Sequence, residues 1–316
     1  MLTPELLHYF AVGIPVVCAG LGTGVGQGIA ALGAIESLVR QQLGREQSFR
    51  AMIIGLALVE SALVIALVVS ILTLFGPQAV ITWPIAFAEL GMSIAIGFSS
   101  LFVGLSSSYA VRSACISITR QPFASQKVLT LMLLIQSLIE AALVFSFIVA
   151  LFIRNGINPE LDIYGGLKLL SAGLAIGIGC IGPLLGQAIF ANKACLAVGF
   201  NSDAYKRVLP YSLLSEAAIE TPLIFSLLVS LLILYFPLNP SNYFLSIVSF
   251  SIAAVTIGLG SFGAVASGRV SAKGCQEVAL NSEIYASLLR STLLAQAFIE
   301  STVIYALIVS LFLLIR

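Results

Sequence analysis

The chain has 316 residues, of which 59% are hydrophobic and only 9% are charged, and its mean hydropathy is +1.09. Soluble domains carry about 25% charged residues, so this composition excludes a soluble globular protein. The formal net charge of +1 indicates no particular class of partner. We expect a membrane protein that binds no nucleic acid and has no cofactor.

Apolar runs recur along the whole chain, and each is long enough to cross a membrane as a helix whose backbone groups are satisfied internally. Eight such runs are predicted, at residues 10–39, 51–75, 85–111, 128–153, 169–198, 208–236, 243–268 and 288–315. They leave no room for a soluble catalytic domain. The sequence therefore predicts an all-α membrane protein that is not itself an enzyme.

The basic residues cluster in alternate loops. Twelve of the fifteen Lys and Arg residues lie in or beside these loops, whereas the opposite side has only Arg154, Lys168 and Arg316. Because cytoplasmic loops carry an excess of Lys and Arg, we expect the basic loops to be cytoplasmic and both termini to lie outside. The eight helices then form four tandem hairpins, at residues 1–80, 81–160, 161–240 and 241–316.

In the first hairpin, the first run is rich in small residues and the second is not. The segment CAGLGTGVGQGIAALGA has five alternating glycines, at Gly20, Gly22, Gly24, Gly26 and Gly28. Small residues let helices approach closely in lipid, so we expect this helix to lie in an inner layer. A glycine-rich phosphate loop is disfavoured, because no strand precedes the glycines. The second run, AMIIGLALVESALVIALVVSILTLF, is typical of an outer, lipid-facing helix, yet it contains Glu60.

The other three hairpins repeat this pattern with a period of 80 residues. The glutamates are Glu60, Glu140, Glu220 and Glu300, within LVESALVI, LIEAALVF, AIETPLIF and FIESTVIY. A polar residue precedes each glutamate by 33 positions, at Gln27, Ser107, Gln187 and Ser267. The polar loops begin 20 positions before each glutamate and read RQQ, RQP, FNS and LNS. Agreement at three offsets indicates an internal fourfold repeat.

A carboxylate in the middle of a membrane span is costly while it is ionised, by about 3 kcal/mol on insertion scales. A bound proton or cation removes most of that cost, so such residues usually mark ion pathways. The alternative is a protonated side chain that only bonds a neighbouring helix. Four acids at one depth favour the ion pathway. Three polar residues lie one helical turn before their glutamates and either support the site or pack between helices: Gln136, Glu216 and Gln296.

Each hairpin resembles the c subunit of the F-type rotary ATP synthases. The resemblance rests on the alternating glycines, on the loop sequence Arg120, Gln121 and Pro122, and on the four glutamates. It implies a rotor ring made with other copies, in which the glutamates pass the stator's a subunit, which holds an arginine between two aqueous half-channels. It also implies that the polar loops contact the central stalk, here through Arg40, Gln41, Arg120, Gln121 and Pro122. The implied location is the bacterial inner membrane, with membrane lipid around the ring.

Two departures qualify this resemblance. Only the second hairpin keeps the complete Arg-Gln-Pro loop, so stalk contact is expected mainly from the first two loops. The fusion of hairpins is also similar to the proteolipids of vacuolar-type ATPases, which often lose one glutamate. All four glutamates are present here, which suits a rotor able to support ATP synthesis as well as hydrolysis.

The transported ion is either H⁺ or Na⁺. Sodium-binding members of the family use the inner-helix Gln, the Glu, a Ser directly after it and a carbonyl two residues before it, taken from two adjacent hairpins. The residues here that match this ligand set, or occupy its positions, are Gln27, Gln187, Ser61, Thr221, Ser301, Thr302 and Tyr305. Pro222 lacks an N–H and so leaves the carbonyl of Ala218 without its helical partner.

The ligand set is uneven, because Ser107 and Ser267 replace the Gln and Ala141 replaces the hydroxyl residue. The poorest site limits the ion, since every site must be filled to cross the lipid. A proton needs only an acceptor, so we predict proton transport, with sodium as the alternative. An alternative from another class is a secondary transporter or channel with a glutamate-lined path, and a third is a membrane scaffold. Transporters usually have inverted repeats, whereas these repeats are parallel.

Overall fold

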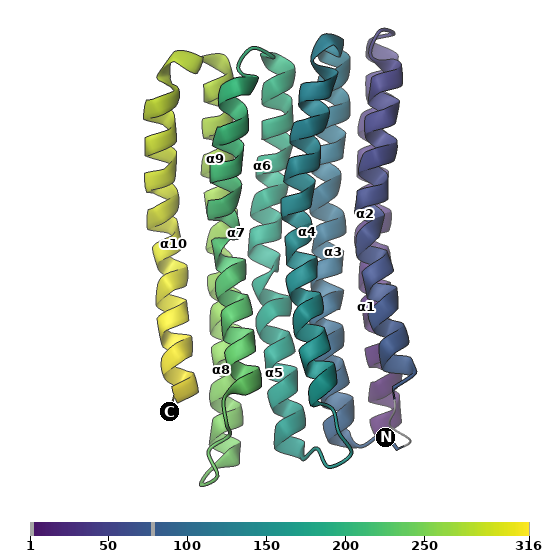
Figure 1. Cartoon of the computed structure of the whole chain (residues 1–316), viewed down its shortest axis with the longest axis vertical. Helices are drawn as coiled ribbons and strands as arrows, with labels where there is room; N and C mark the ends of the chain where they lie inside the picture. The colour runs from purple at the N-terminus through teal and green to yellow at the C-terminus, as the bar shows by residue number, and fades with distance from the viewer. Residues whose placement is uncertain (1–2, 77–79, 316) are drawn as a thin grey trace.

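A computed structural model describes residues 3–76 and 80–315, without the side chain of Arg40. Within these residues the secondary structure is entirely helical, and eight helical spans are long and apolar enough to cross a membrane. The predicted all-α membrane fold is confirmed. Figure 1 shows the helices running side by side along one axis, with both ends of the described chain at the same end of the bundle. Arg316 lies outside the described residues.

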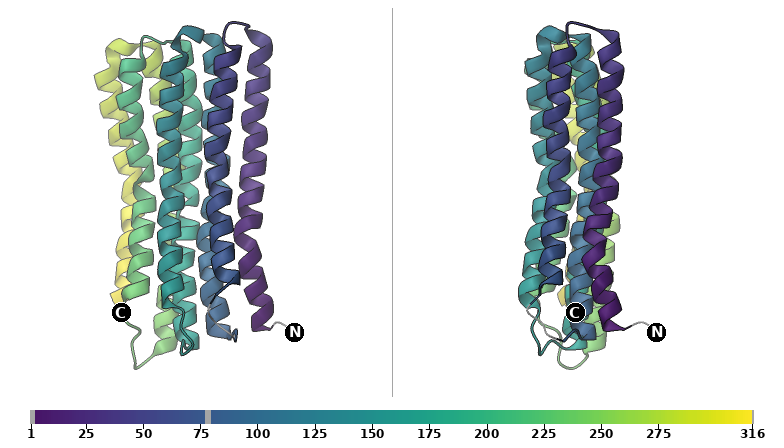
Figure 2. Two further views of the ribbon diagram at one scale, coloured as in Figure 1. Left: turned by 45° about the vertical axis from the view of Figure 1, so that its right-hand side comes forward. Right: turned by 90° about the vertical axis from the view of Figure 1, so that its right-hand side faces the viewer.

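The helices form two rows. The right-hand view of Figure 2 looks along the rows and shows the narrow side of the bundle. The inner row consists of α1 (Pro4–Arg40), α3 (Trp83–Arg120), α5 (Ile163–Gly179) with α6 (Ile181–Phe200), and α8 (Tyr243–Gly260) with α9 (Gly263–Leu280). The outer row consists of α2 (Arg45–Leu74), α4 (Ser125–Gly156), α7 (Tyr205–Tyr235) and α10 (Tyr285–Ile315). Two short 3-10 helices lie in the polar loops, at Pro122–Ala124 and Ser282–Ile284. The glycine-rich helices are inside and the glutamate-bearing helices are outside, as predicted.

Backbone contact between neighbouring helices holds the inner row together. Helix α3 packs directly on α5, and a Cβ added to Gly173 would overlap the carbonyl group of Gly91. Only a residue without a side chain allows this approach. The inner helices are therefore fixed to one another at backbone distance, whereas the outer helices meet through side chains.

Two inner spans differ from the prediction, because each is broken near its middle. The span predicted at 169–198 divides at Cys180, and the span predicted at 243–268 divides at Ser261 and Phe262. Pro183 has no N–H to donate to the carbonyl of Gly179, which weakens the first helix at the break. The second break lies between Gly260 and Gly263, and glycine lowers helix stability. The paired segments still continue in line (Figure 1).

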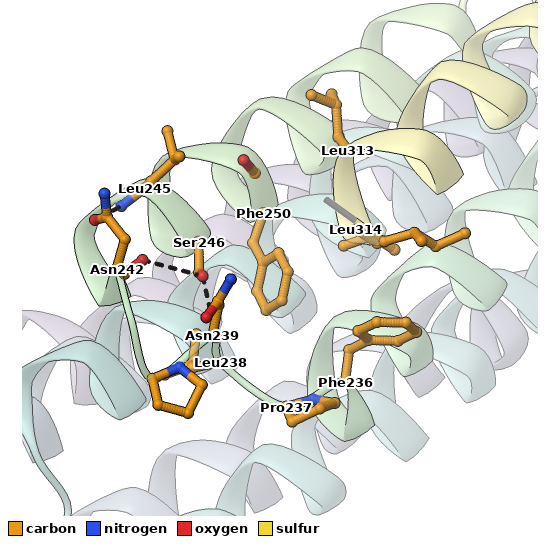
Figure 3. A pocket seen from close by; sticks show the side chains of 13 residues that line it. Phe236, Pro237, Leu238, Asn239, Asn242, Leu245, Ser246, Phe250, Leu313 and Leu314 are labelled. Carbon is orange, nitrogen blue, oxygen red and sulfur yellow. Dashed lines mark hydrogen bonds between the residues drawn. The ribbon is translucent and has the colours of Figure 1, made fainter.

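A hollow of about 310 Å³ lies beside the connection between α7 and α8, at the end of the bundle that holds the termini. Figure 3 shows Phe236, Phe250 and Leu314 around it, with Asn242 at the start of α8. Asn242 accepts a hydrogen bond from the backbone N–H of Leu245 at 3.0 Å and so caps α8. Among the described residues, no acidic side chain lines this hollow, so it is separate from the four repeated glutamates.

Candidate ion-binding sites

Each outer helix carries one of the four repeated glutamates. Glu60 lies on α2, Glu140 on α4, Glu220 on α7 and Glu300 on α10. Glu60 is exposed and the other three are half-buried. The four carboxyl groups therefore lie on four separate helices, at equivalent positions along the outer row.

The clearest contact of a repeated glutamate joins two hairpins. The Ser61 hydroxyl on α2 donates a hydrogen bond to Oε1 of Glu140 on α4, at 3.3 Å. Ser61 directly follows Glu60, so the residue after one glutamate reaches the glutamate of the next hairpin. The contact therefore gives the row a direction that the sequence had left open, from the residue after one glutamate to the glutamate of the following hairpin.

The equivalent positions at the other interfaces differ from Ser61. Ala141 has no hydroxyl to offer Glu220. The hydroxyls of Thr221, Ser301 and Thr302 bond carbonyls of their own helices, at 3.1, 2.7 and 2.8 Å. Tyr305 is 67% exposed, and among the described residues its hydroxyl bonds no glutamate. The structure thus pairs a hydroxyl with a carboxyl at one interface of the three within the chain.

The polar residues of the inner helices also differ among the hairpins. Gln27 is half-buried, and it forms no hydrogen bond to Glu60 within the described part of the chain. Ser107 and Gln187 are completely buried, and their side-chain polar atoms have no hydrogen-bond partner among the described residues. Ser267 accepts a hydrogen bond from Nε2 of Gln296 on α10, at 2.9 Å.

A second polar layer lies one turn from the glutamates, toward the polar loops. Nε2 of Gln136 donates to the carbonyl of Gly55 at 3.3 Å, and Nε2 of Gln296 donates to the carbonyl of Ser215 at 3.2 Å. Each bond joins an outer helix to the outer helix of the preceding hairpin. These two amides therefore join neighbouring hairpins by hydrogen bonds, one helical turn from the repeated glutamates.

Glu216 occupies the same position in the third hairpin but carries a carboxyl group instead of an amide. It is completely buried beside the amide of Gln187, and neither of its oxygens reaches a hydrogen-bonding partner among the described residues. Buried polar groups are nearly always satisfied, and a buried charge without a partner is strongly unfavourable. The outer helix of the third hairpin therefore carries two carboxyl groups one turn apart, Glu216 and Glu220. The outer helix of each other hairpin carries only its repeated glutamate at these two positions.

The polar loops lie together at the end of the bundle opposite the termini. The guanidinium of Arg120 lies over the ring of Phe200 at 4.8 Å, and Nε2 of Gln121 donates to the carbonyl of Phe200 at 3.2 Å. Gln41 is exposed and Pro122 is half-buried, while the side chain of Arg40 lies outside the described part. Phe123 directly follows Pro122 and is fully exposed. It was not among the predicted loop residues, although a large apolar residue in a polar loop is visible in the sequence.

Glu89 is a second residue that the sequence-based prediction missed. It lies in α3, is almost completely buried, and its Oε2 is 2.7 Å from Nδ1 of His8. His8 lies within α1, because α1 begins at Pro4 and so starts before the first apolar run predicted at residues 10–39. The positions equivalent to Glu89 in the other hairpins are Tyr9, Leu169 and Ser249, so this pair stands apart from the fourfold repeat.

The fold and the four acids define an integral membrane protein built from four copies of one carboxylate-bearing hairpin. A family model that describes the C subunit of ATP synthase matches the chain four times, at residues 10–73, 90–153, 170–233 and 252–313. The chain belongs to this family, and the resemblance to the c subunit is confirmed.

Single-hairpin relatives agree with this assignment. The ATP synthase c subunit of Dehalococcoides mccartyi is 38% identical over 69 residues, which are 22% of this chain and 91% of the relative. That of Chloroflexus aurantiacus is 38% identical over 68 residues, 22% of this chain and 90% of the relative. That of Mycoplasma mobile is 36% identical over 80 residues, 25% of this chain and 80% of the relative. One relative thus corresponds to about one hairpin of this chain.

Proposed function

We propose that the chain is a rotor-ring component of the membrane sector of a rotary ATP synthase, in which Glu60, Glu140, Glu220 and Glu300 each carry one proton. The observation that carries this proposal is the contact between Ser61 and Glu140, which places a carboxyl group at the junction of two hairpins. A loaded, neutral carboxyl tolerates lipid, whereas an empty, ionised one must stay near water or a positive charge. Loading and unloading then set the direction in which the ring turns.

The two edges of the bundle support assembly with further copies. On α1, Gly22 and Gly26 pack on α3, whereas a Cβ added to Gly20 or Gly24 would meet open space. The opposite edge exposes large apolar residues of α10, including Phe298. A ring of several copies covers both edges. The family also supports the stator's a subunit and a central stalk as the other partners, with stalk contact through Gln41, Arg120 and the adjoining loop residues.

The orientation and location follow from the same proposal. The polar loops carry most of the Lys and Arg residues, which favours a cytoplasmic position for the loops and an outside position for both termini. We place the chain in a bacterial inner membrane. It would be a non-catalytic component, and a potential of 100 mV would supply about 2.3 kcal/mol for each charge that it carries.

The direction of ligand sharing supports the assignment of protons. Continued around the row, it gives Glu220 the side chain of Ala141, which has no ligand atom. The amide of Gln187 lies beside Glu216 in the same hairpin. Glu220 therefore has the poorest set of sodium ligands. Because each site must be filled before it faces lipid, this site favours an ion that needs only the carboxyl group.

Sodium has one specific observation in its favour. The same direction of sharing brings Ser301 of one copy to Gln27 and Glu60 of the next copy, which completes the Gln, Glu and hydroxyl set at the joint between chains. A water molecule can replace a missing ligand at the other sites. A secondary transporter or channel is less well supported, because the four glutamates lie on separate helices of one row instead of around a single path.

Chemical modification of the carboxyl groups tests the proposal. We expect a hydrophobic carbodiimide to label the four repeated glutamates and to stop ATP-coupled ion movement in membrane vesicles that contain the assembled complex. We expect Na⁺ at neutral pH to leave the labelling rate unchanged. Protection by Na⁺ would replace H⁺ with Na⁺ as the transported ion. Full labelling with unimpaired ATP-coupled ion movement would contradict the rotor proposal itself.

A further inference from the structure

Four cations lie on the inner helices about two or three turns before the polar loops, and two of them have acidic partners. Arg112 lies 3.9 Å from Glu36, and Lys273 lies 2.5 Å from Glu277. Lys193 on α6 and Arg269 on α9 have no acidic side chain within 4 Å in the described part of the chain. A charge inside a membrane span is costly unless it is neutralised or hydrated. No acid of the described chain neutralises Lys193 and Arg269, so an anion or water from outside the chain must do so.

Both cations line one groove of about 390 Å³ on the inner row. Its residues come from α3, α6 and α9, and the outer helices contribute none. The groove therefore opens on the face of the inner row that turns away from the outer helices. It is lined by Tyr109, Leu185, Ala188, Ile189, Asn192, Lys193, Val265 and Arg269.

Polarity changes in one direction along this groove. Leu185 and Val265 lie nearer the middle of the chain's helical spans, whereas Asn192 and Lys193 lie nearer the polar loops. At about 1.5 Å per residue, Leu185 and Lys193 are about 12 Å apart along the helix axis. An apolar groove that ends at two cations matches the shape and charge of a lipid with an anionic headgroup. A free anion would leave the apolar part of the groove unfilled.

We infer that this groove binds an anionic phospholipid from the leaflet at the polar-loop end. Its phosphate group lies between Lys193 and Arg269, and an acyl chain lies along Leu185, Ile189 and Val265. Basic pockets between membrane helices bind anionic headgroups, and each cation near an anionic membrane surface contributes about a fivefold preference. The inference requires only that the chain spans a membrane, so it does not depend on which ion the glutamates carry.

Lipid binding to the purified full-length chain tests this inference. Native mass spectrometry would measure binding of phosphatidylglycerol and of phosphatidylcholine added to detergent micelles. We expect the anionic lipid to bind about 30-fold more tightly, as two cations predict. The double variant Lys193→Gln/Arg269→Gln should bind both lipids equally, and each single variant should keep about a fivefold preference.

Two further variants localise the effect. Lys206→Gln/Arg290→Gln removes two exposed cations at the loop ends of the outer helices and should keep the full preference. Ala188→Phe fills the groove without changing its charge and should reduce the binding of both lipids. Equal binding of the two lipids by the unmodified chain would overturn the inference. So would a preference that survives the loss of Lys193 and Arg269, or undiminished binding of the anionic lipid by Ala188→Phe.

Discussion

The inner helices contact one another through their backbones, whereas the outer helices contact one another through side chains. In the inner row, α3 and α5 approach until the backbones at Gly91 and Gly173 touch. In the outer row, neighbouring helices meet through a few polar bonds, such as that between Ser61 and Glu140. The inner row thus fixes the spacing of the hairpins, and the outer row leaves Glu140, Glu220 and Glu300 half-buried and Glu60 exposed. A closely packed row of glycine-rich helices and a layer of four glutamates are thus separated within one bundle.

The largest expected effect comes from removing one acid of the outer row. Glu220→Gln should abolish ATP-driven proton pumping, because an amide cannot load a proton and every copy of the chain would carry one empty site. Dye quenching in inverted membrane vesicles measures this. Glu160→Gln, which removes an exposed carboxyl from a connection outside the helices, should pump normally. Normal pumping by Glu220→Gln would remove Glu220 from the ion pathway.

Adding one carbon atom to the inner row should lower the stability of the fold without changing the surroundings of the four glutamates. Gly173→Ala places a Cβ against the backbone of α3, and we expect a loss of about 1–3 kcal/mol in the free energy of unfolding. Gly13→Ala, at a glycine with open space around it, is the matched control and should have no such loss. Detergent unfolding of the purified chain, followed by circular dichroism, compares the two. Equal stability would mean that the inner helices do not meet at backbone distance.

A smaller loss of stability is expected from removing the amide hydrogen bonds that join helices of the outer row. Gln296→Leu removes bonds to the carbonyl of Ser215 and to the hydroxyl of Ser267, and should cost about 1 kcal/mol in the free energy of unfolding. Gln136→Leu removes a single bond to Gly55 and should cost about half as much. The same unfolding assay ranks them. The reverse order would show that the amide bonds do not set the stability of these junctions.

The smallest effect concerns a single hydroxyl at the Glu220 site. Ala141→Ser supplies the group that Ser61 supplies to Glu140, and a hydrogen bond of ordinary strength corresponds to about fivefold in binding. On the proton proposal, Na⁺ should protect Glu220 against carbodiimide neither in the unmodified chain nor in Ala141→Ser. On the sodium alternative, Ala141→Ser should strengthen the protection of Glu220 about fivefold, and Ser61→Ala should weaken that of Glu140 by a similar factor. Protection by Na⁺ that is equal in both variants and in the unmodified chain would mean that this hydroxyl position is not part of the site.

The sequence predicted the positions of the acids but not their partners. The 80-residue period places all four glutamates on outer helices because each repeat must occupy the same place in its hairpin. It does not say which neighbour supplies a hydroxyl, since a row of hairpins can run in either direction. The contact between Ser61 and Glu140 depends on that direction and needed the structure.

Other differences arise from residues that depart from the repeat. His8 and Glu89 form a pair between two hairpins, which no fourfold comparison reveals because each lacks an equivalent elsewhere. The breaks at Cys180 and Ser261 fall inside continuous apolar runs, where hydropathy alone predicts one helix. Gln187, which the family pattern assigns to the ion, lies beside Glu216, just as Ser267 lies beside Gln296 at the same positions of the fourth hairpin.

The arrangement of the four acids in the assembled complex is the most direct test of the rotor proposal. Electron cryo-microscopy of the complex in membranes would locate Glu60, Glu140, Glu220 and Glu300 relative to the ring axis. We expect them to lie at even intervals around the outer rim, each at a junction between two outer helices. Convergence of the four carboxyl groups on one shared pore would contradict the proposal.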